Sequence, residues 1–352
     1  MTAAAGATVL LDCRWLSIGG AGRLTELLLR GFCRRPPVGR WLLWGPPRTA
    51  ELAWPGAEVV PNAVDPRAAF GQRSWFRLPR CDLAVFLHQQ RPLRRVPAVT
   101  LILDTIPLRH GSRRVDRAAK RLFLRRVAAS SHEVATISEY SRSCIATDLD
   151  TDPRRVSVLS LPVDDELVTR VRNLRACRPR APAALYVGAF LPHKNLPRLV
   201  EAFGRTRFCA SGGQLWLVGG ANGHRRALEA SLSPSQRGWV SVRGRCSDGE
   251  LEELLATASF LVQPSLEEGF GLPVAEALSC GLPVCVSDGG ALPEVAAGRA
   301  DPFPARSARA MAAGIDAAAQ RAAAGDAGPA WRGPTCDDFA RQVEELVWRN
   351  LA

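Results

Sequence analysis

Residues 265–284 read SLEEGFGLPVAEALSCGLPV, in which a glycine-containing turn leads into a helical segment. Pro273 suits the first turn of a helix and Gly281 suits its end. Two carboxylates, Glu268 and Glu276, lie on either side of the turn. A carboxylate only accepts hydrogen bonds and repels a phosphate, so these acids should face hydroxyl groups. Packing alone does not require such a pattern, and we interpret the stretch as a ligand-binding turn.

Around this stretch, short apolar runs alternate with amphipathic helical segments. Such alternation predicts parallel sheets that are covered on both faces by helices. Two series of this kind predict an α/β fold of two doubly wound, Rossmann-like domains facing a cleft. The expected strands are residues 9–13, 41–44, 83–87, 99–103, 134–137, 156–160, 184–187, 215–218, 240–243, 260–263 and 284–287. The expected helices include residues 22–33, 115–130, 196–203 and 248–256.

A chain of 352 residues is long for one core, and two domains are the natural expectation. The polar, arginine-rich segment 164–182 is expected to be the linker. The predicted boundaries are residues 1–175 for the first domain, 182–335 for the second and 336–352 for a terminal helix.

The charge is unevenly distributed along the chain, whose formal net charge is +12. Residues 1–180 hold 30 Lys and Arg against 16 Asp and Glu, whereas residues 181–352 hold 16 against 18. The excess in the N-terminal half indicates an anionic partner there. Nucleic acid is not expected, because no aromatic-rich strand face or recognition motif accompanies the charge.

Composition points to the cytoplasm. No apolar run reaches the roughly 18 residues of a membrane span, and the N-terminal residues do not have the pattern of a signal peptide. The ten cysteines are scattered without a Cys-x-x-Cys pair, which favours reduced thiols over disulfides or a zinc site.

Ligands of doubly wound sheets bind at the carboxyl ends of the strands. Three further loops at such positions carry candidate residues. Gly20 and Gly22 follow the first strand and would let backbone amides approach an anion. Lys194 precedes a helix and offers a point charge for phosphate; Gly219, at a strand end, would let a base or ribose lie against the backbone. Each feature alone is also compatible with a flexible turn or a solvated side chain, but together they fit a nucleotide sugar.

The stretch Glu268-Gly-Phe-Gly-Leu-Pro-Val-Ala-Glu276 resembles the E-x7-E motif of retaining glycosyltransferases of the GT-B fold, family 4. The similarity extends over PSLEEGFGLPVAEALSCGLPVCVSDGGALPEV, residues 264–295, and YVGAFLPHKNLPRLVEAF, residues 186–203. ATISEYSRSCIA and ILDTIPLRH resemble acceptor-side segments of the same family. The pattern is most similar to the mannosyltransferase-like subgroup that acts on surface polysaccharides.

The resemblance implies a role for each donor-side residue. Glu276 would hold the ribose hydroxyls, and Glu268 would contact the donor sugar near its reacting face. Lys194 would neutralise the leaving diphosphate. The remaining implied donor contacts are the backbone amides of Phe270, Gly271 and Leu272, the glycines Gly20 and Gly22 from the other domain, and Gly219 with the Gly244–Arg245 loop near the base. No metal and no further cofactor are expected.

Two positions depart from the family pattern. Leu103 stands where many members carry a histidine that contacts the donor sugar, and the neighbouring Asp104, or His88, is the expected partial substitute in a catalytic role. Ala189 stands where members often carry an arginine, and His193 beside Lys194 could donate in its place.

The segment from residue 113 to 126 reads RRVDRAAKRLFLRR. Its basic residues at 114, 117, 121 and 125 share one helical face. The predicted apolar face holds Val115, Ala118, Ala119, Leu122 and Phe123. Either this helix packs on the sheet with a solvated arginine face, or that face contacts an anionic leaflet, where each cation adds about 1 kcal/mol.

Together these features predict a hexosyltransferase of polysaccharide biosynthesis. It would use a nucleotide-diphosphate sugar, of mannose type or related, and a glycan or lipid-linked acceptor, with retention at the anomeric carbon. The expected location is cytoplasmic, with possible peripheral contact to the inner face of the cell membrane. The alternatives are a sugar-nucleotide epimerase and a catalytically impaired glycosyltransferase-like partner protein.

Overall fold

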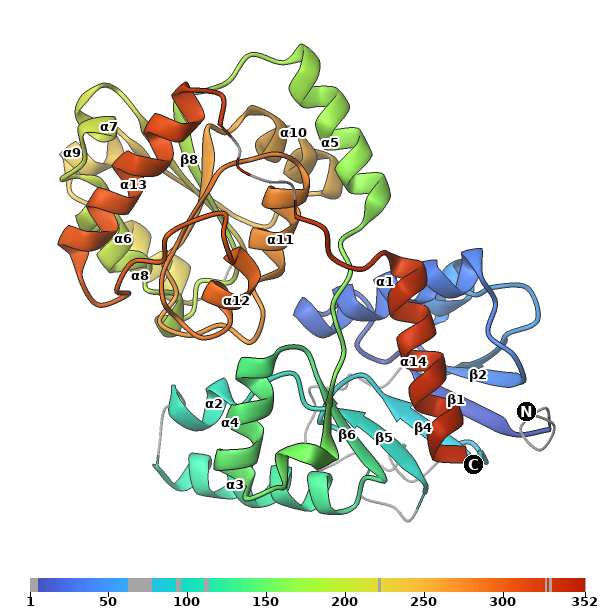
Figure 1. The fold of residues 1–352 in the computed structure, drawn as a ribbon. Coiled ribbons are helices and arrows are strands. Elements are labelled where there is room, and N and C mark those ends of the chain that lie inside the picture. The colour runs from blue at the N-terminus through green and yellow to red at the C-terminus, as the bar shows by residue number, and fades with distance from the viewer. Residues whose placement is uncertain are drawn as a thin grey trace. The chain divides into compact units, whose positions relative to one another are not determined.

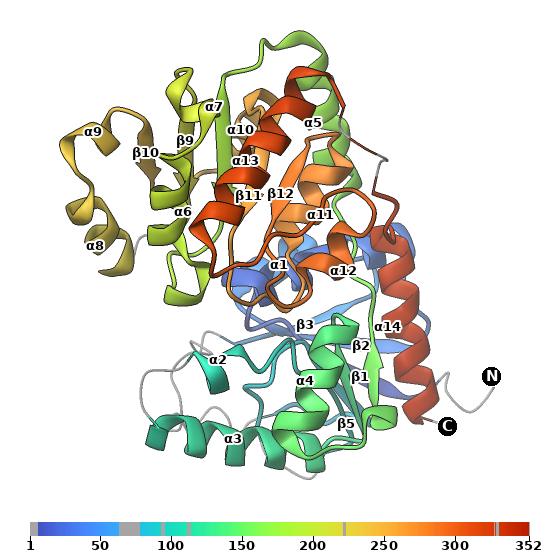
Figure 2. The ribbon, with the colours of Figure 1, turned by 60° about the vertical axis from the view of Figure 1, so that its left-hand side comes forward.

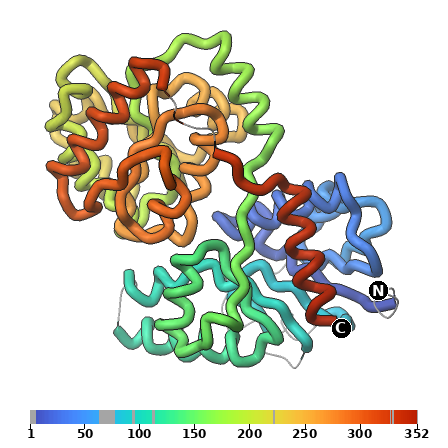
Figure 3. The backbone as a smooth tube through the Cα atoms, in the orientation of Figure 1, coloured from blue at the N-terminus to red at the C-terminus, as the bar shows by residue number. Residues whose placement is uncertain are grey.

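The computed structural model describes residues 6–62, 78–92, 96–110, 114–220, 223–326, 328 and 331–351. The chain forms two compact units. Unit 1 comprises Met1–Pro162 and Gly333–Ala352, and unit 2 comprises Val163–Arg332. The chain therefore passes from unit 1 into unit 2 and back again, which can be followed along the tube in Figure 3.

Unit 1 is built on a parallel sheet of seven strands in the order β3-β2-β1-β4-β5-β6-β7 (Figure 1). Its strands are β1 Thr8–Asp12, β2 Arg40–Gly45, β3 Glu58–Pro61, β4 Leu83–Phe86, β5 Ala98–Leu101, β6 Glu133–Thr136 and β7 Val156–Val158. Its α-helices are α1 Gly19–Arg34, α2 Ile106–Arg109, α3 Arg114–Ala129, α4 Glu139–Leu149 and α14 Cys336–Leu351.

Unit 2 is built on a parallel sheet of five strands in the order β10-β9-β8-β11-β12. Its strands are β8 Ala183–Val187, β9 Gln214–Val218, β10 Val240–Arg243, β11 Phe260–Gln263 and β12 Val284–Val286. Its α-helices are α5 Asp165–Cys177, α6 Leu196–Phe203, α7 Arg207–Ala210, α8 Gly223–Ser231, α9 Pro234–Arg237, α10 Asp248–Thr257, α11 Leu272–Ser279, α12 Leu292–Ala296 and α13 Ala308–Ala323.

Helices cover both faces of the unit 2 sheet (Figure 2). Successive side chains of β8 enter two different cores. Leu185 packs with residues of α5, α10 and α11, whereas Ala184 and Tyr186 pack with residues of α6 and α13. Because both faces are buried, the strands are apolar throughout. This confirms the predicted class of two Rossmann-like α/β units; a cleft between them stays a prediction.

The predicted linker is wrong, because most of residues 164–182 form helix α5. Asp164 caps this helix by accepting from the amides of Glu166 and Leu167 at 3.1 and 3.4 Å. Leu167 and Val171 are buried in a core of unit 2. These two residues belong to an apolar stripe with a period near four residues, which the surrounding charged residues obscured in the sequence. Because α5 packs in unit 2, the first part of unit 1 ends at Pro162 and not at the predicted residue 175.

The terminal helix α14 lies alongside α1 in unit 1 (Figure 1). The helices approach closely at Gly31, where an added Cβ would lie 2.3 Å from the carbonyl oxygen of Cys336. The amide of Val38 donates to Oε1 of Glu344 at 3.0 Å. The second predicted boundary, at 335, is close to the observed division after Arg332.

The apolar face predicted for the basic helix is also wrong. Val115 and Leu122 on α3 are 78% and 52% exposed. The residues of α3 that are buried in unit 1 are Leu124, Val127 and Ala128, so only the C-terminal half of the helix packs on the core. Arg113, at the start of the basic segment, lies outside the described residues.

Candidate active site

Two loops of unit 2 carry the central candidates. One follows β8 and the other follows β11, and these strands are parallel neighbours in the sheet, so their carboxyl ends meet at one edge. The amide of Leu266 donates to the carbonyl of His193 at 2.7 Å. The side-chain amide of Asn195 donates to the carbonyls of Pro264 and Ala305 at 3.0 and 2.8 Å. These bonds hold the two loops together.

The structure brings Lys194 and Glu268 into a direct ion pair. Lys194 Nζ lies 2.7 Å from each carboxylate oxygen of Glu268, and the two side chains are 14% and 10% exposed. Oε1 of Glu268 also accepts from Gln263 Nε2 at 2.6 Å and from Ser265 Oγ at 2.7 Å. Burial alone would raise the pKa of the Glu268 carboxyl, but the charge of Lys194 and these hydrogen bonds lower it below its usual value.

Sequence reasoning missed this pairing. It assigned Glu268 to sugar hydroxyls, whereas in the structure the carboxylate faces the lysine ammonium. Glu268 therefore orients Lys194, and its contact with a sugar stays a prediction. The sequence did show that Lys194 and Glu268 each follow a predicted strand. It did not show that these two strands, β8 and β11, are neighbours in the sheet, which is what brings the two side chains together.

The ion pair predicts a specific dependence of stability on pH. Because the folded-state pKa of Glu268 is lowered, its stabilising contribution is complete above the unfolded value near 4.5 and is lost as the pH falls through the lower folded value. At pH 7 we expect Glu268→Gln to unfold at a lower temperature than the parent chain, with a loss of about 1–3 kcal/mol.

Calorimetric scans from pH 7 to pH 3 would check this expectation. The difference in Tm between the parent and Glu268→Gln should shrink below pH 4.5. Glu253→Gln is the control, because Glu253 pairs with Arg178 at 3.2 Å on the surface and is 46% exposed. A difference that stays constant down to pH 3 would show that the Glu268 carboxylate does not contribute through its charge.

The turn before α11 has the geometry that the motif suggested. Gly271 has φ +100°, a conformation that favours glycine, and an added Cβ would also lie 2.7 Å from Leu292 Cδ2. The amides of Phe270, Gly271 and Leu272 donate to no acceptor within the described part of the chain. Glu276 follows on α11 and is 7% exposed. The turn therefore presents donors at a helix N-terminus, as an anionic or hydroxyl-rich ligand requires.

Two glycines after β12, Gly289 and Gly290, lie against the backbone of the loop that carries Glu268. Gly290 has φ +71°, and an added Cβ would lie 2.3 Å from the Glu268 carbonyl oxygen. At Gly289 the added atom would lie 2.1 Å from the carbonyl oxygen of Ser265. The amide of Ala291 donates to the Glu268 carbonyl at 3.0 Å. This positioning role was not predicted for the segment that follows β12.

Gly219 and Gly244, both predicted to lie near the base, are neighbours. The amide of Gly219 donates to the Gly244 carbonyl at 3.2 Å. Gly219 also approaches the preceding loop so closely that a Cβ would lie 1.7 Å from the carbonyl oxygen of Gly188. His193 is half-buried next to Lys194; its backbone is tied to the second loop, and a donor role for its side chain stays a prediction.

In unit 1, the glycines after β1 belong to a helix rather than to a loop. Helix α1 begins at Gly19, three residues before the predicted start. Gly20 is exposed. At Gly22 an added Cβ would lie 2.5 Å from the carbonyl oxygen of Trp15, so its role within unit 1 is close packing. Their predicted contact with a diphosphate stays a prediction.

Asp104 and His88 lie at one cavity of unit 1, with a volume of about 310 Å³. Trp15 also lines it and stacks on His88 with ring centroids 3.8 Å apart. Asp104 Oδ1 accepts from the amide of Ile106 at 3.0 Å. Leu103 is half-buried and is not among the residues that line the cavity.

The polar groups of this cavity suit hydroxyl groups. The amide of Gln90 donates to Nδ1 of His88 at 3.1 Å, which leaves the proton on Nε2. Burial and the charge of Arg14 lower the pKa of His88 to about 3, so the ring is neutral at pH 7. Gln89 and Gln90 also line the cavity; their Oε1 atoms are buried and have no hydrogen-bond partner among the described residues.

A metal site is not evident in the part of the chain that the structure describes, where no group of three or more His, Cys, Asp or Glu side chains could hold an ion.

The fold and the loop geometry define a two-unit α/β protein of the GT-B class. Residues 181–321 match the family model described as glycosyl transferases group 1. The match places this segment, which lies within unit 2, in that family.

Three similarities show how far this relationship extends. The chain is 37% identical over 173 residues to MMP alpha-(1->4)-mannosyltransferase of Mycolicibacterium hassiacum, covering 49% of this chain and 40% of the relative. It is 30% identical over 226 residues to O-antigen chain mannosyltransferase B of Escherichia coli, covering 58% and 56%. The chain thus spans about half the length of these relatives.

The third similarity concerns the fold alone. The crystal structure of Anabaena Alr3699/HepE in complex with UDP and glucose matches with a TM-score of 0.73, covering 97% of this chain and 100% of that one at 16% identity.

Proposed function

We propose that the chain is a hexosyltransferase that moves a sugar of mannose type from a nucleotide-diphosphate donor to a hydroxyl group of a glycan or lipid-linked acceptor. The observation that carries the proposal is the Lys194–Glu268 pair, held at the carboxyl ends of β8 and β11 beside the amide donors of the α11 turn. Both curated relatives described above are named mannosyltransferases, which supports mannose as the sugar.

In the proposed reaction, the bond from the anomeric carbon to the diphosphate oxygen breaks. The acceptor oxygen forms its bond on the same face, so that the configuration is retained, and its proton passes to the departing diphosphate. Lys194 and the N-terminal end of α11 place positive charge where the diphosphate gains negative charge. Glu268 orients Lys194, so the two glutamates need not act as the acid–base pair of a retaining glycosidase.

The cavity of unit 1 is the proposed acceptor site. Trp15 offers an aromatic face and His88 a neutral Nε2–H donor, which together suit the hydroxyls and the apolar face of a sugar. Asp104, on the same cavity, can accept a hydrogen bond from the hydroxyl group that reacts.

The basic balance of unit 1 supports a peripheral membrane contact and an acceptor on a cytoplasmic membrane face. Unit 1 contains 27 Lys and Arg against 17 Asp and Glu, whereas unit 2 contains 19 against 17. The exposed Val115 and Leu122 of α3 lie among these cations, a combination typical of interfacial helices. Among the described residues, no helix is both long and apolar enough to cross a membrane.

A panel of nucleotide sugars tests the proposal. We expect release of a nucleoside diphosphate from a mannose nucleotide, detected by chromatography, and faster release when the polysaccharide or lipid-linked acceptor is present. An epimerised donor would identify an isomerase instead. A donor that binds but stays intact with every acceptor would favour the catalytically impaired partner protein.

A further inference from the structure

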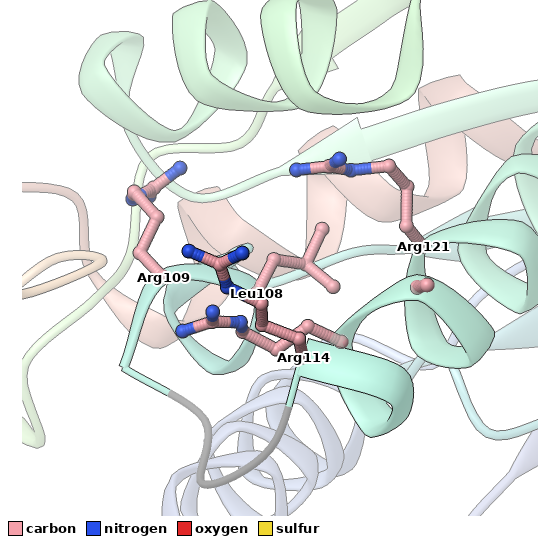
Figure 4. Close-up of a pocket in the computed structure, with 6 residues that line it drawn as sticks. Leu108, Arg109, Arg114 and Arg121 are labelled. Atoms are coloured by element: carbon pink, nitrogen blue, oxygen red, sulfur yellow. The ribbon is translucent and has the colours of Figure 1, made fainter.

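A second pocket of unit 1, which shares only Leu108 with the lining of the acceptor cavity, gathers positive charge. It has a volume of about 430 Å³ and is lined by Leu108, Arg109, Arg114, Arg117, Ala118 and Arg121. In the close-up, the side chain of Arg121 on α3 extends toward Arg109, the last residue of α2 (Figure 4). Arg114, the first residue of α3, lies near Leu108 of α2 (Figure 4). The lining includes no carboxylate.

The arginines of this pocket differ in how they are held. Arg109 is anchored, because it pairs with Asp148 and donates to Thr105 Oγ1 at 3.1 Å. Arg114, Arg117 and Arg121 have no ion pair or side-chain hydrogen bond within the described ranges. Asp116, the acid in the first turn of α3, is exposed and does not line the pocket.

Three guanidinium groups without a counter-ion, beside the paired Arg109, repel each other unless an anion lies among them. A guanidinium presents its N–H donors in a planar fork that matches the oxygens of a phosphate. The pocket also lies at the N-terminal end of α3, where the peptide dipoles add positive potential. Charge and donor geometry therefore point to phosphate chemistry.

We infer that Arg109, Arg114, Arg117 and Arg121 bind a phosphate or diphosphate group of the acceptor. Leu108 borders both this pocket and the cavity of His88 and Asp104. An acceptor whose sugar lies in the cavity would thus place a phosphate linked to that sugar among the arginines. The inference rests on the proposed function and narrows the acceptor class to phosphate-linked glycans.

Calorimetric titration of inorganic pyrophosphate at low ionic strength tests the pocket without needing the acceptor. The Lys194→Ala background removes the cationic side chain that is proposed to contact the donor diphosphate. In this background we expect binding at one site. Adding Arg117→Ala and Arg121→Ala should weaken it by at least about tenfold, because each hydrogen bond from a charged group is worth roughly that factor.

The matched control is Arg125→Ala with Arg126→Ala. Both residues are exposed on the same helix and do not line the pocket, so the same loss of charge should leave the affinity within about twofold. Equal weakening by both pairs, or an absence of pyrophosphate binding, would overturn the inference. If the alanine pair lowers the Tm, Arg117→Gln with Arg121→Gln keeps the side-chain volume and is titrated in its place.

An additional experiment with vesicles distinguishes binding of a single phosphate group from binding to a lipid surface. The fraction of protein that sediments with phosphatidylglycerol vesicles should fall equally for the two double variants if binding to the membrane depends only on total charge. Loss of vesicle binding in Arg117→Ala/Arg121→Ala, with unchanged pyrophosphate affinity, would assign the arginines to lipid headgroups and overturn the inference. Failure of the donor panel, in contrast, would remove the transferase while leaving the pyrophosphate result intact.

Discussion

Replacing Lys194 with alanine is expected to lower the kcat of sugar transfer by about 100- to 1,000-fold, the size typical of losing one group that stabilises developing charge. The ammonium is held by both oxygens of Glu268 at 2.7 Å and is only 14% exposed. A preorganised charge in such a site acts on the leaving diphosphate without having to reorient. Turnover measured with the donor identified by the panel checks the expectation.

The same substitution also leaves Glu268 without its counter-ion. Breaking a buried pair by removing one partner costs about 3–5 kcal/mol of stability, so a loss of turnover alone could reflect unfolding. The double variant Lys194→Ala/Glu268→Gln separates the two effects: it should recover much of the lost Tm and none of the lost kcat. Arg205→Ala removes a cation from an exposed pair with Glu201 in the same unit and should leave turnover unchanged. If folded Lys194→Ala protein turned over as fast as the parent chain, the assignment of Lys194 to the leaving diphosphate would be wrong.

The second large effect is expected on stability, at Gly219. A Cβ there would lie 1.7 Å from the Gly188 carbonyl oxygen and 2.8 Å from its carbonyl carbon. Neither backbone can move easily, because the Gly188 amide donates to Val218 at 3.0 Å and the Gly219 amide donates to Gly244 at 3.2 Å. We expect Gly219→Ala to destabilise unit 2 by about 3 kcal/mol or more, the upper end of overpacking.

The neighbouring glycine is a matched control. An added Cβ at Gly220 meets nothing within 4 Å, so Gly220→Ala should change stability by about 0.5 kcal/mol or less. For a unit of this size, the loss in Gly219→Ala corresponds to a fall of roughly 6–12 °C in Tm. Calorimetry measures the fall, and hydrogen exchange of peptides from β8 and β9 shows whether unit 2 is the part affected. Equal Tm values for the two alanine variants would contradict the close approach.

Much of the fold followed from local patterns. The bounds of β11 and α6 agree with the predicted residues 260–263 and 196–203, because apolar runs and amphipathic periods act within a few residues. The edge strand β3 was missed, since its two valines are only half-buried. Residues 164–182, which include helix α5, were predicted to be a linker because their five arginines outweighed the apolar stripe that contains Leu167 and Val171.

For the candidate site too, some features followed from local sequence patterns and others did not. The motif at residues 268–276 pointed to a glycine turn that opens a helix, and Gly271 at φ +100° occupies that turn. The ion pair between Lys194 and Glu268 could not be predicted, because 74 residues separate them. Their contact depends on the insertion of β8 between β9 and β11, which is a property of strand order and not of any local pattern.

By itself, the sequence determined the two α/β series, the turn of the E-x7-E stretch and the basic character of the first half, because each depends on residue types at short spacing. Only the tertiary structure decided what those groups face. In the tertiary structure Glu268 faces Lys194, and Val115 and Leu122 stay exposed. The physical reason is that burial and charge pairing depend on which distant segments pack together, and short-range patterns do not specify that.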